Sequence, residues 1–380
     1  MSEAFIKQFG TGNGSIKERK FQAPARINII GEHVDYLGGI VLPAAIDFHI
    51  NATIRPNGTS GYRLYSEDFM SFWETNEITK SDKAPWANYI LGVIDQFMER
   101  GFEVPGFDLS LEGNIPQGAG LSSSAAVEVS VGYAINEVFQ LGLDRTEIAL
   151  IGQAAENHFV GTNCGIMDQF IIAWGKEKHC ISLDTSSLKF EYHHFDLGNH
   201  EFYLIQSNVK HSLKDSAYND RRADCENALR KIQKIHPGLL NLYSLESSTD
   251  LASLGLSDNE LKRVKHVITE KARTERVIAG LRDGNFIDVG NALYECHDSL
   301  SKYFEVSCRE TDFLVETLRK EKIIGARMIG GGFGGCILVI DQIGRMDDTR
   351  AKIDQAYKVE FGMRADFYQF KISDGVREII

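Results

Sequence analysis

Apolar runs rich in β-branched residues predict strands in the first third of the chain. "ARINII" and "GIVLPAAIDFHINATI" flank the polar segment "EHVDYLGG". "GYRLYS" and "FDLSLEGNI" are expected to form further strands. The pattern therefore predicts strands on both sides of a loop that carries several ionisable groups.

Apolar residues spaced by three and four positions predict helices between and after these strands. In residues 86–99 the apolar face consists of Ile90, Val93, Ile94 and Phe97. After a glycine-rich loop, the next apolar face consists of Val127, Val131, Ala134, Ile135 and Val138. Asp144 and Glu147 form a capping-box pattern at the start of another helix, which is expected to end near Asn157. A loop, "VGTNCGIMDQF", is expected to follow this helix.

Strand-like and helical segments alternate in the second half of the chain. "EFYLIQSNV" predicts a strand and "AYNDRRADCENALRKI" a helix, and helices are expected to dominate residues 257–320. The segment "GARMIGGGFGGCILVI", which contains a glycine cluster and a strand-like run, follows these helices. This mixture favours an α+β fold over a regular doubly wound sheet. The 380 residues suffice for two domains, and because no linker marks a boundary we place the division near residue 175.

Composition narrows the class of protein. The formal net charge of −12 argues against a general nucleic-acid binder, which normally needs a basic face. The six cysteines are scattered without a CxxC pair, which fits a reducing compartment better than a disulfide framework or a structural zinc site. The first residues lack the pattern of a signal peptide, and no apolar run reaches the roughly 18 residues of a membrane helix. We therefore expect a cytoplasmic protein without a nucleic-acid or membrane partner.

The segment "PQGAGLSSSAA", residues 116–126, joins a glycine-rich loop to the start of a helix. Glycine lets the backbone approach a ligand closely, and the unpaired N–H groups of a first helical turn attract anions such as phosphate. Ser122, Ser123 and Ser124 add hydroxyls that can hold phosphate oxygens or Mg²⁺. A serine-capped helix without a ligand is the alternative. The Walker pattern is absent, and the loop comes too late in the chain for a Rossmann fingerprint.

A second glycine cluster, "IGGGFGGC", formally satisfies GxGxxG through Gly330, Gly332 and Gly335. The strand-like "CILVI" follows it, whereas a dinucleotide site requires a helix at that point. We expect this cluster to let two backbones approach or to form the wall of a pocket, with a plain turn as the alternative.

Two carboxylates lie in or near the predicted loop before residue 170. Asp168 is flanked by a glycine and apolar residues, where a carboxylate can serve as a general base, although lone loop aspartates more often cap turns. Glu156 is either a solvated surface residue or, together with a hydroxyl of the phosphate loop, a ligand of Mg²⁺, which prefers oxygen atoms.

The segment "IGEHVDYLGG" places Glu32, His33 and Asp35 within four positions. A zinc site is unattractive, because zinc favours several His and Cys ligands and His33 is the single nitrogen ligand nearby. A charged turn is the alternative, but apolar residues lie on both sides. Carboxylates and an imidazole together favour recognition of sugar hydroxyls.

Considered together, six segments resemble the galactokinases of the GHMP kinase superfamily, in the family's order and over nearly the whole chain. They are "ARINIIGEHVDYLGGIVLPAAI", "PQGAGLSSSAAVEVS", "AENHFVGTNCGIMDQF", "VKHSLKDSAYNDRR", "CHDSLSKYFEVSC" and "RMIGGGFGGC". The resemblance implies an α+β, two-domain GHMP kinase fold, with an S5-like N-terminal domain in residues 1–175, a ferredoxin-like C-terminal domain in residues 176–380 and the active site between them. It also implies transfer of the γ-phosphoryl group of ATP to the C1 hydroxyl of galactose, with Mg²⁺, by a monomer or weak homodimer.

The resemblance implies roles for individual residues as well. Asp168 matches the family's catalytic base and Arg26 its partner. The positions that match sugar contacts are Glu32, His33, Asp35, Gly165 and Tyr218. The positions that match the triphosphate loop are Gly118, Ala119, Gly120, Leu121, Ser122, Ser123 and Ser124, and those that match Mg²⁺ ligands are Ser124 and Glu156. Ser66 and Trp86 fall where the family meets the nucleotide.

Four positions depart from the common bacterial pattern of the family: Ala25, Val34, Leu37 and Ile329 replace Gly, Thr, Asn and Thr. We expect Val34 and Leu37 to change the rim of the sugar pocket, and an apolar residue at position 37 also resembles the N-acetylgalactosamine kinases. The short chain without insertions favours galactose. The alternatives are a kinase for N-acetylgalactosamine or another galactose-like hexose, and a weakly active galactose sensor, which the intact "GLSSSAA" and Asp168 disfavour.

Overall fold

The structure, a computed structural model, describes residues 3–11, 17–209 and 214–379. Its N-terminal half is organised around a long sheet with the strand order β13-β1-β3-β6-β4-β5. The strands are β1 (Arg19–Asn28), β3 (Pro43–Pro56), β4 (Tyr62–Ser66), β5 (Ser71–Thr75), β6 (Phe107–Gly113) and β13 (Arg377–Ile379). Neighbours are antiparallel apart from β4 and β6, which run parallel. The strands expected from the β-branched runs are thus confirmed.

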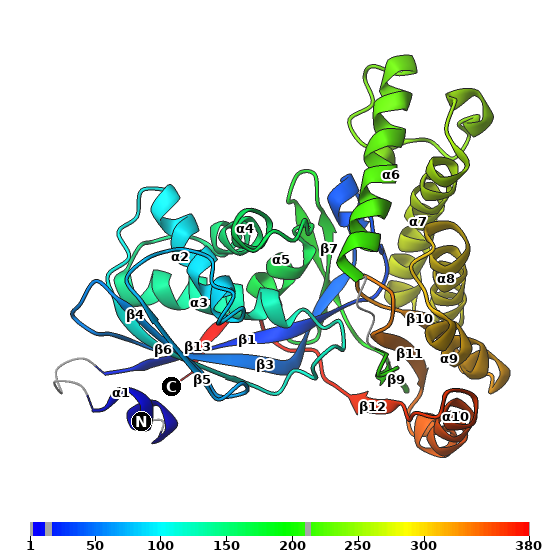
Figure 1. Cartoon of the computed structure of the whole chain (residues 1–380). Coiled ribbons are helices and arrows are strands. Elements are labelled where there is room, and N and C mark those ends of the chain that lie inside the picture. The colour runs from blue at the N-terminus through cyan, green and yellow to red at the C-terminus, as the bar shows by residue number, and fades with distance from the viewer. Residues whose placement is uncertain (1–2, 12–16, 210–213, 380) are drawn as a thin grey trace.

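Helices cover one face of this sheet (Figure 1). They are α2 (Ala87–Glu99), α3 (Ser123–Phe139), α4 (Arg145–Ala154), the short π-helix η2 (Ala155–Val160) and α5 (Met167–Trp174), whereas α1 (Glu3–Phe9) lies near β4 and β5. Both α3 and α5 pack directly on β1 and β3. The predicted capping box is confirmed, since Asp144 and Glu147 exchange side chain-to-backbone hydrogen bonds of 2.9 and 2.8 Å at the start of α4.

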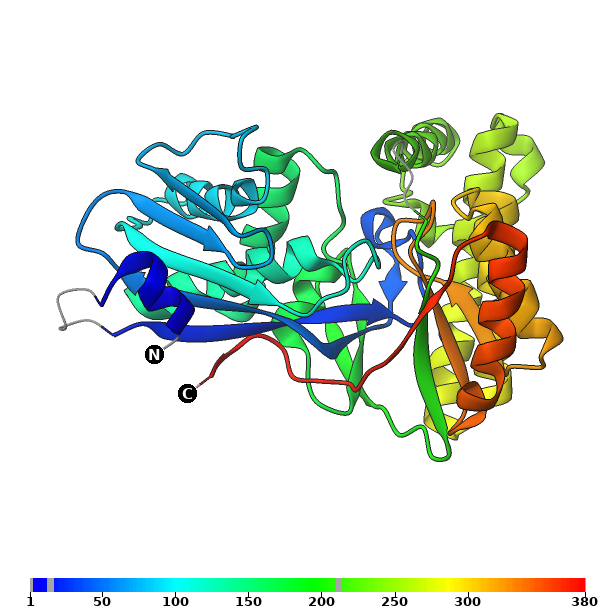
Figure 2. The same cartoon turned by 60° about the horizontal axis from the view of Figure 1, so that its bottom comes forward.

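The C-terminal half contains a second antiparallel sheet with the order β10-β11-β9-β12. Its strands are β9 (His200–Gln206), β10 (Gly325–Met328), β11 (Cys336–Gln342) and β12 (Asp366–Gln369). The helices of this half are α6 (Lys214–Ile235), α7 (Asp258–Asp283), α8 (Phe286–Ser299), α9 (Arg309–Lys320) and α10 (Arg345–Phe361), with short turns η3 (Leu242–Ser244), η4 (Leu251–Leu254) and η5 (Leu300–Phe304). Figure 2 shows α8 to α10, in yellow to red, on one side of this sheet.

Strands from both halves of the chain also pair with one another. The C-terminal strand β13 extends the N-terminal sheet beside β1, and β2 (Ile40–Val41) pairs with β7 (His179–Asp184), which pairs with β8 (Phe190–His194). The domain boundary near residue 175 stays a prediction. In the part of the chain that the structure describes, no helix combines the length and apolar character needed to span a membrane.

Candidate active site

A cavity of about 620 Å³ lies where the covering helices meet the C-terminal half. Two loops form much of its wall: residues 30–39, called here the ionisable loop, and residues 116–126, called the phosphate loop. The sequence-predicted residues in its wall are Arg26, Glu32, His33, Asp35, Gly118, Ala119, Gly120, Leu121, Ser122, Ser123, Ser124, Glu156, Gly165, Asp168 and Tyr218. The structure therefore brings most of the predicted residues to one place.

The phosphate loop turns into α3 through left-handed backbone. Gly118 and Gly120 have φ of 71°, and Ser122, directly before the helix, has φ of 61°. The Ser122 side chain does not cap the helix; its hydroxyl donates to the carboxylate of Asp168 instead. The expected serine therefore stands at the N-cap position, but its side chain makes no capping hydrogen bond. The first turn of α3 keeps amide donors at the cavity wall, where an anion is favoured.

The sequence pattern predicted a loop at Asp168. In the structure, Asp168 instead lies in the first turn of α5. The prediction fails because the apolar neighbours Met167 and Phe170 become buried when the chain coils at this point. Asp168 also does not act as a lone turn cap, since its carboxylate accepts hydrogen bonds from Arg26 and Ser122.

Arg26 links Asp168 to the phosphate loop. Its Nε and Nη2 donate to the two carboxylate oxygens of Asp168 at 2.6 and 2.7 Å, and Nη1 donates to the carbonyl of Gly120 at 2.7 Å. Burial opposes the charge of Arg26, but the adjacent Asp168 carboxylate raises its pKa. The pairing of β1 with β3 shifts register between Pro24 and Ala25, directly before Arg26, and such irregularities re-aim side chains next to active sites.

The ionisable loop presents groups with shifted protonation equilibria. Burial and the neighbouring His266 lower the pKa of His33 to about 3, and His33 Nε2 is buried without a hydrogen-bond partner among the described residues. Burial, with the nearby carboxylate of Asp168, raises the pKa of Asp35 to about 7. Burial raises the pKa of Glu32 as well. A neutral imidazole with a free nitrogen and a carboxyl group beside it suit donors and acceptors such as hydroxyls.

Gly165 and Tyr218 complete this side of the cavity. A Cβ atom on Gly165 would lie 1.9 Å from Oδ2 of Asp35, so only glycine leaves room for that carboxylate. The Tyr218 ring, from α6, lies 5.6 Å from the His33 ring and 5.8 Å from the Tyr36 ring, measured between centroids. In the segment "VKHSLKDSAYNDRR" that precedes and includes Tyr218, residues 210–213 lie outside the described residues.

Glu156 is buried in η2, so the interpretation as a solvated surface residue is wrong. Burial and Asp168 raise its pKa to about 6, and hydrogen bonds that include one from Ser124 oppose this shift. Gln169 Nε2 donates to Oε2 of Glu156 at 2.9 Å. One carboxylate and one hydroxyl fit Mg²⁺, which usually binds few protein ligands and keeps water and substrate phosphates. Within the described ranges no three His, Cys, Asp or Glu residues form a metal cluster, so phosphates and water would complete such a site.

Ser66 and Trp86 do not line the cavity. Ser66 is buried at the end of β4 and pairs with Ser71 of β5, and Trp86 Nε1 donates to the Ser71 hydroxyl at 3.2 Å. Both residues therefore lie together at the β4–β5 hairpin. Tyr89, one turn after Trp86 along α2, does reach the cavity wall and was missed from the sequence.

The second glycine cluster forms a hairpin loop between β10 and β11. A strand follows it, as expected, so the dinucleotide interpretation is excluded. Gly330 and Gly331 line the cavity, and a Cβ atom on Gly330 would lie 3.2 Å from the carbonyl oxygen of Gly120. The expectation of close backbone approach and of a pocket wall is confirmed.

The chain is similar to known proteins over most of its length. The galactokinase galactose-binding signature matches residues 3–56, the GHMP kinases N terminal domain residues 88–176 and the GHMP kinases C terminal residues 277–358. The galactokinase of Thermotoga petrophila is 42% identical over 95% of this chain and 100% of its own length. The galactokinase of Bacillus subtilis is 38% identical over 99% of this chain and 97% of its own length. The chain belongs to the galactokinase family.

Solved structures agree with this assignment to the galactokinase family. A crystal structure of Lactococcus lactis galactokinase complexed with galactose superposes with a TM-score of 0.94 at 34% identity, over 99% of this chain and 98% of that chain. Mevalonate kinase of Methanococcus jannaschii shares the fold, with a TM-score of 0.66 at 17% identity over 95% and 100% of the two chains. The predicted α+β GHMP kinase fold is confirmed.

The four departures from the galactokinase pattern do not lie on the rim of the cavity. Ala25, Val34, Leu37 and Ile329 are all buried, and none of them lines the cavity. Val34 instead packs against the space left by Gly39. The expectation that Val34 and Leu37 reshape the rim of the sugar pocket is therefore wrong, because both side chains face the core.

Sequence reasoning missed three side chains from the C-terminal half that hold the ionisable loop: His266, Glu270 and Arg327. Arg327 begins the matched segment "RMIGGGFGGC", so the motif contained the residue but no indication of its partner. His266 and Glu270 belong to the long, mostly polar helix α7, where nothing in the spacing distinguishes them from surface residues.

Proposed function

We propose that this protein transfers the γ-phosphoryl group of ATP to the C1 hydroxyl of galactose. The observation that carries the proposal is the contact of Arg26 with both Asp168 and the carbonyl of Gly120. This contact fixes a carboxylate beside a loop suited to phosphate, while the hydroxyl-binding groups of the ionisable loop line the same cavity. The Lactococcus lactis galactokinase complex with galactose supports the choice of sugar.

In the proposed reaction, Asp168 accepts the proton of the C1 hydroxyl as its oxygen attacks the γ-phosphorus. The bond from that phosphorus to the bridging oxygen breaks and ADP leaves. Arg26 and the amide groups at the start of α3 offset negative charge on the phosphates, and positioning with charge neutralisation supplies most of the catalysis. The base contributes about 10²- to 10⁴-fold.

Mg²⁺ would be held by Ser124 and Glu156 with the ATP phosphates. When bound, it neutralises phosphate charge and orients the triphosphate. The sugar would contact Glu32, His33 and Asp35, with Gly165 and Tyr218 closing the pocket. Ser66 and Trp86 would lie on the nucleotide side at the β4–β5 hairpin. We further propose a cytoplasmic enzyme that acts as a monomer or weak homodimer.

A panel of hexoses with ATP and Mg²⁺, read out by ADP release, tests the proposal. Galactose is expected to give the highest kcat/KM, with N-acetylgalactosamine and other galactose-like hexoses turned over less efficiently. A higher kcat/KM for N-acetylgalactosamine would assign the protein to that substrate. Absence of ADP release with every hexose would favour the alternative that the protein is a galactose sensor and not an active kinase.

A further inference from the structure

The backbone of the ionisable loop adopts a conformation that needs external support. Gly31 has φ of 89°, and a Cβ atom there would lie 2.5 Å from the carbonyl oxygen of Ile40. His33, which is not glycine, has φ of 56°. A left-handed residue other than glycine costs about 1–2 kcal/mol, so surrounding contacts must hold it in place.

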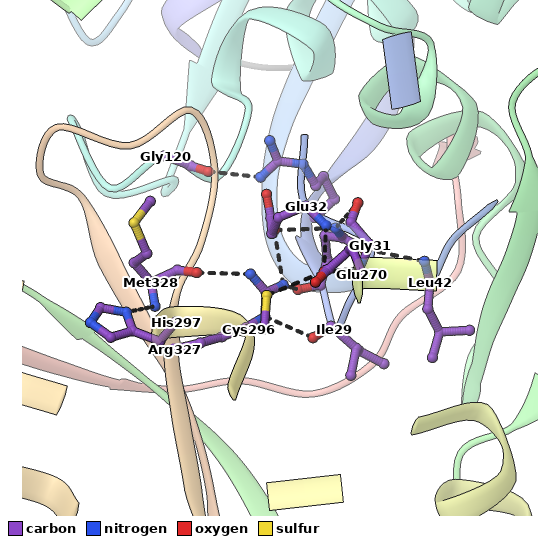
Figure 3. A network of polar contacts seen from close by, with 12 residues as sticks. Ile29, Gly31, Glu32, Leu42, Gly120, Glu270, Cys296, His297, Arg327 and Met328 are labelled. Carbon is purple, nitrogen blue, oxygen red and sulfur yellow. Dashed lines mark hydrogen bonds and ion pairs between the residues drawn. The ribbon is translucent and has the colours of Figure 1, made fainter. Parts of the chain in front are cut away.

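A carboxylate from α7 supplies the first of these contacts. Oε1 of Glu270 accepts hydrogen bonds from the backbone N–H groups of Gly31 at 2.9 Å and of Glu32 at 3.0 Å (Figure 3). Glu270 is fully buried, and Arg273 donates to its other oxygen at 2.7 Å. Burial alone would raise the pKa of Glu270, but Arg273 and its other partners lower it to about 2. The loop amides therefore meet an ionised carboxylate, which is a strong acceptor.

Side chains of the C-terminal half also bind the carbonyl oxygen and the carboxylate of Glu32. Arg327, fully buried on β10, donates to the carbonyl of Ile29 at 2.9 Å and to Oε1 of Glu32 at 2.8 Å (Figure 3). Nε2 of His266 lies 3.0 Å from the carbonyl oxygen of Glu32 and donates to it. The amide, the carbonyl and the carboxylate of Glu32 thus all contact the C-terminal half.

We propose that Glu270, Arg327 and His266 are positioning residues, which set the affinity for the sugar by fixing the ionisable loop without touching the sugar. This inference rests on the proposed function, because it assigns the loop to sugar recognition. None of the three side chains lines the cavity, whereas Glu32, His33 and Asp35 do. Within the described ranges, the hydrogen bonds of these three side chains reach the ionisable loop, the end of β1 and the C-terminal half, and none reaches the phosphate loop. We therefore expect their effect to be specific to the sugar side.

The test compares Glu270→Gln with Glu260→Gln, a matched control on the same helix. Glu260 is also buried and also accepts a backbone N–H, but its partners are Ser257 and Lys231, which do not belong to the loop. In Glu270→Gln the KM for galactose is expected to rise about tenfold or more, with the KM for ATP within about twofold of wild type, since misplaced contacts weaken recognition steeply. Glu260→Gln is expected to leave both KM values within about twofold.

A second readout does not depend on the sugar. Backbone amide hydrogen exchange of a peptide spanning residues 29–34 is expected to be faster in Glu270→Gln than in wild type and unchanged in Glu260→Gln. A galactose KM within twofold of wild type, or equal rises in the KM for galactose and ATP, would overturn the inference. Inactivity of the wild-type protein towards galactose would instead overturn the proposed function, and the exchange data would still decide whether Glu270 holds the loop.

Glu270→Gln also leaves the buried Arg273 without its ionised partner, which can prevent folding. In that case His266→Phe decides, because it removes the donor to the Glu32 carbonyl and keeps an aromatic ring beside Phe304. Its galactose KM is expected to rise about threefold or more with an unchanged KM for ATP. An unchanged galactose KM in a folded His266→Phe variant would overturn the inference.

Discussion

The two loops of the cavity are built in different ways. The phosphate loop is made by contiguous residues, whose glycines supply the turns and whose amides belong to the helix that follows. The ionisable loop is of similar length, yet its backbone is held by side chains that lie more than two hundred positions away along the chain. Distant groups also contact the phosphate loop, since Arg26 and Gln206 donate to its carbonyl oxygens. The two loops therefore differ in which backbone groups receive that support: in the ionisable loop a distant side chain accepts from the backbone amides, whereas the first-turn amides of α3 stay at the cavity wall.

This difference explains how much the sequence could predict. The strands, the helix at 86–99, the capping box at Asp144 and the turn from residues 116–122 into α3 followed from local periodicity and turn chemistry, and the structure confirms them. Phosphate binding by this loop stays a prediction. The helical position of Asp168 was missed because burial of its apolar neighbours decides it. The contacts of Glu270 and Arg327 were missed because no spacing rule reports a contact between distant segments.

The largest effect is expected where both loops converge, at Asp168. Asp168→Asn removes the proton acceptor and half of the ion pair with Arg26, and it keeps the size of the side chain. We expect kcat to fall by about 10²- to 10⁴-fold, with ATP affinity within about twofold of wild type. Steady-state kinetics and ATP titration by calorimetry check this. Wild-type turnover in the variant would disprove the role of Asp168 as the base.

Replacing one glycine in each loop by alanine tests whether the surrounding structure constrains the ionisable loop more tightly than the phosphate loop. In Gly31→Ala the new Cβ atom meets backbone 2.5 Å away, whereas in Gly118→Ala it meets nothing within 4 Å. Both positions have positive φ, so each change costs about 1 kcal/mol of strain, and Gly31→Ala adds the clash. Gly31→Ala is expected to lower Tm by several degrees more than Gly118→Ala and to raise the KM for galactose, as thermal unfolding and kinetics will measure. Equal losses of Tm would contradict this distinction.

The ionisable loop should also make stability depend on pH. Burial and Asp168 raise the pKa of Asp35 from an ordinary 3.8 to about 7. The folded protein then holds a proton that the unfolded chain releases, so the stability that this group contributes is complete below about pH 4 and is lost as pH rises through 7. Each unit by which the folded pKa exceeds the unfolded one costs about 1.4 kcal/mol of stability at high pH, and Asp35→Asn removes this cost because Asn does not titrate. The unfolding free energy of Asp35→Asn minus that of wild type should therefore be larger at pH 8 than at pH 5, as measured by urea denaturation at both pH values. An equal difference at both pH values would show that the pKa of Asp35 is ordinary.

The smallest effect on function is expected at Val34, in the ionisable loop but facing the core. Val34→Thr keeps the shape and buries a hydroxyl, which costs about 1–3 kcal/mol of stability. The ratio of kcat/KM for galactose to that for N-acetylgalactosamine should stay within about threefold of wild type. A larger change in this ratio, measured with both sugars under the same conditions, would show that Val34 does shape the rim of the sugar pocket.

In the proposed reaction, a sugar hydroxyl meets the terminal phosphate of ATP at Asp168. Phosphorus NMR of galactose incubated with ATP, Mg²⁺ and either the wild-type protein or Asp168→Asn tests it most directly. We expect a new phosphomonoester signal coupled to the proton on C1 of galactose for the wild type, and at most a slow appearance of that signal for the variant. A phosphate on another carbon, or equal rates of formation for the two proteins, would contradict it.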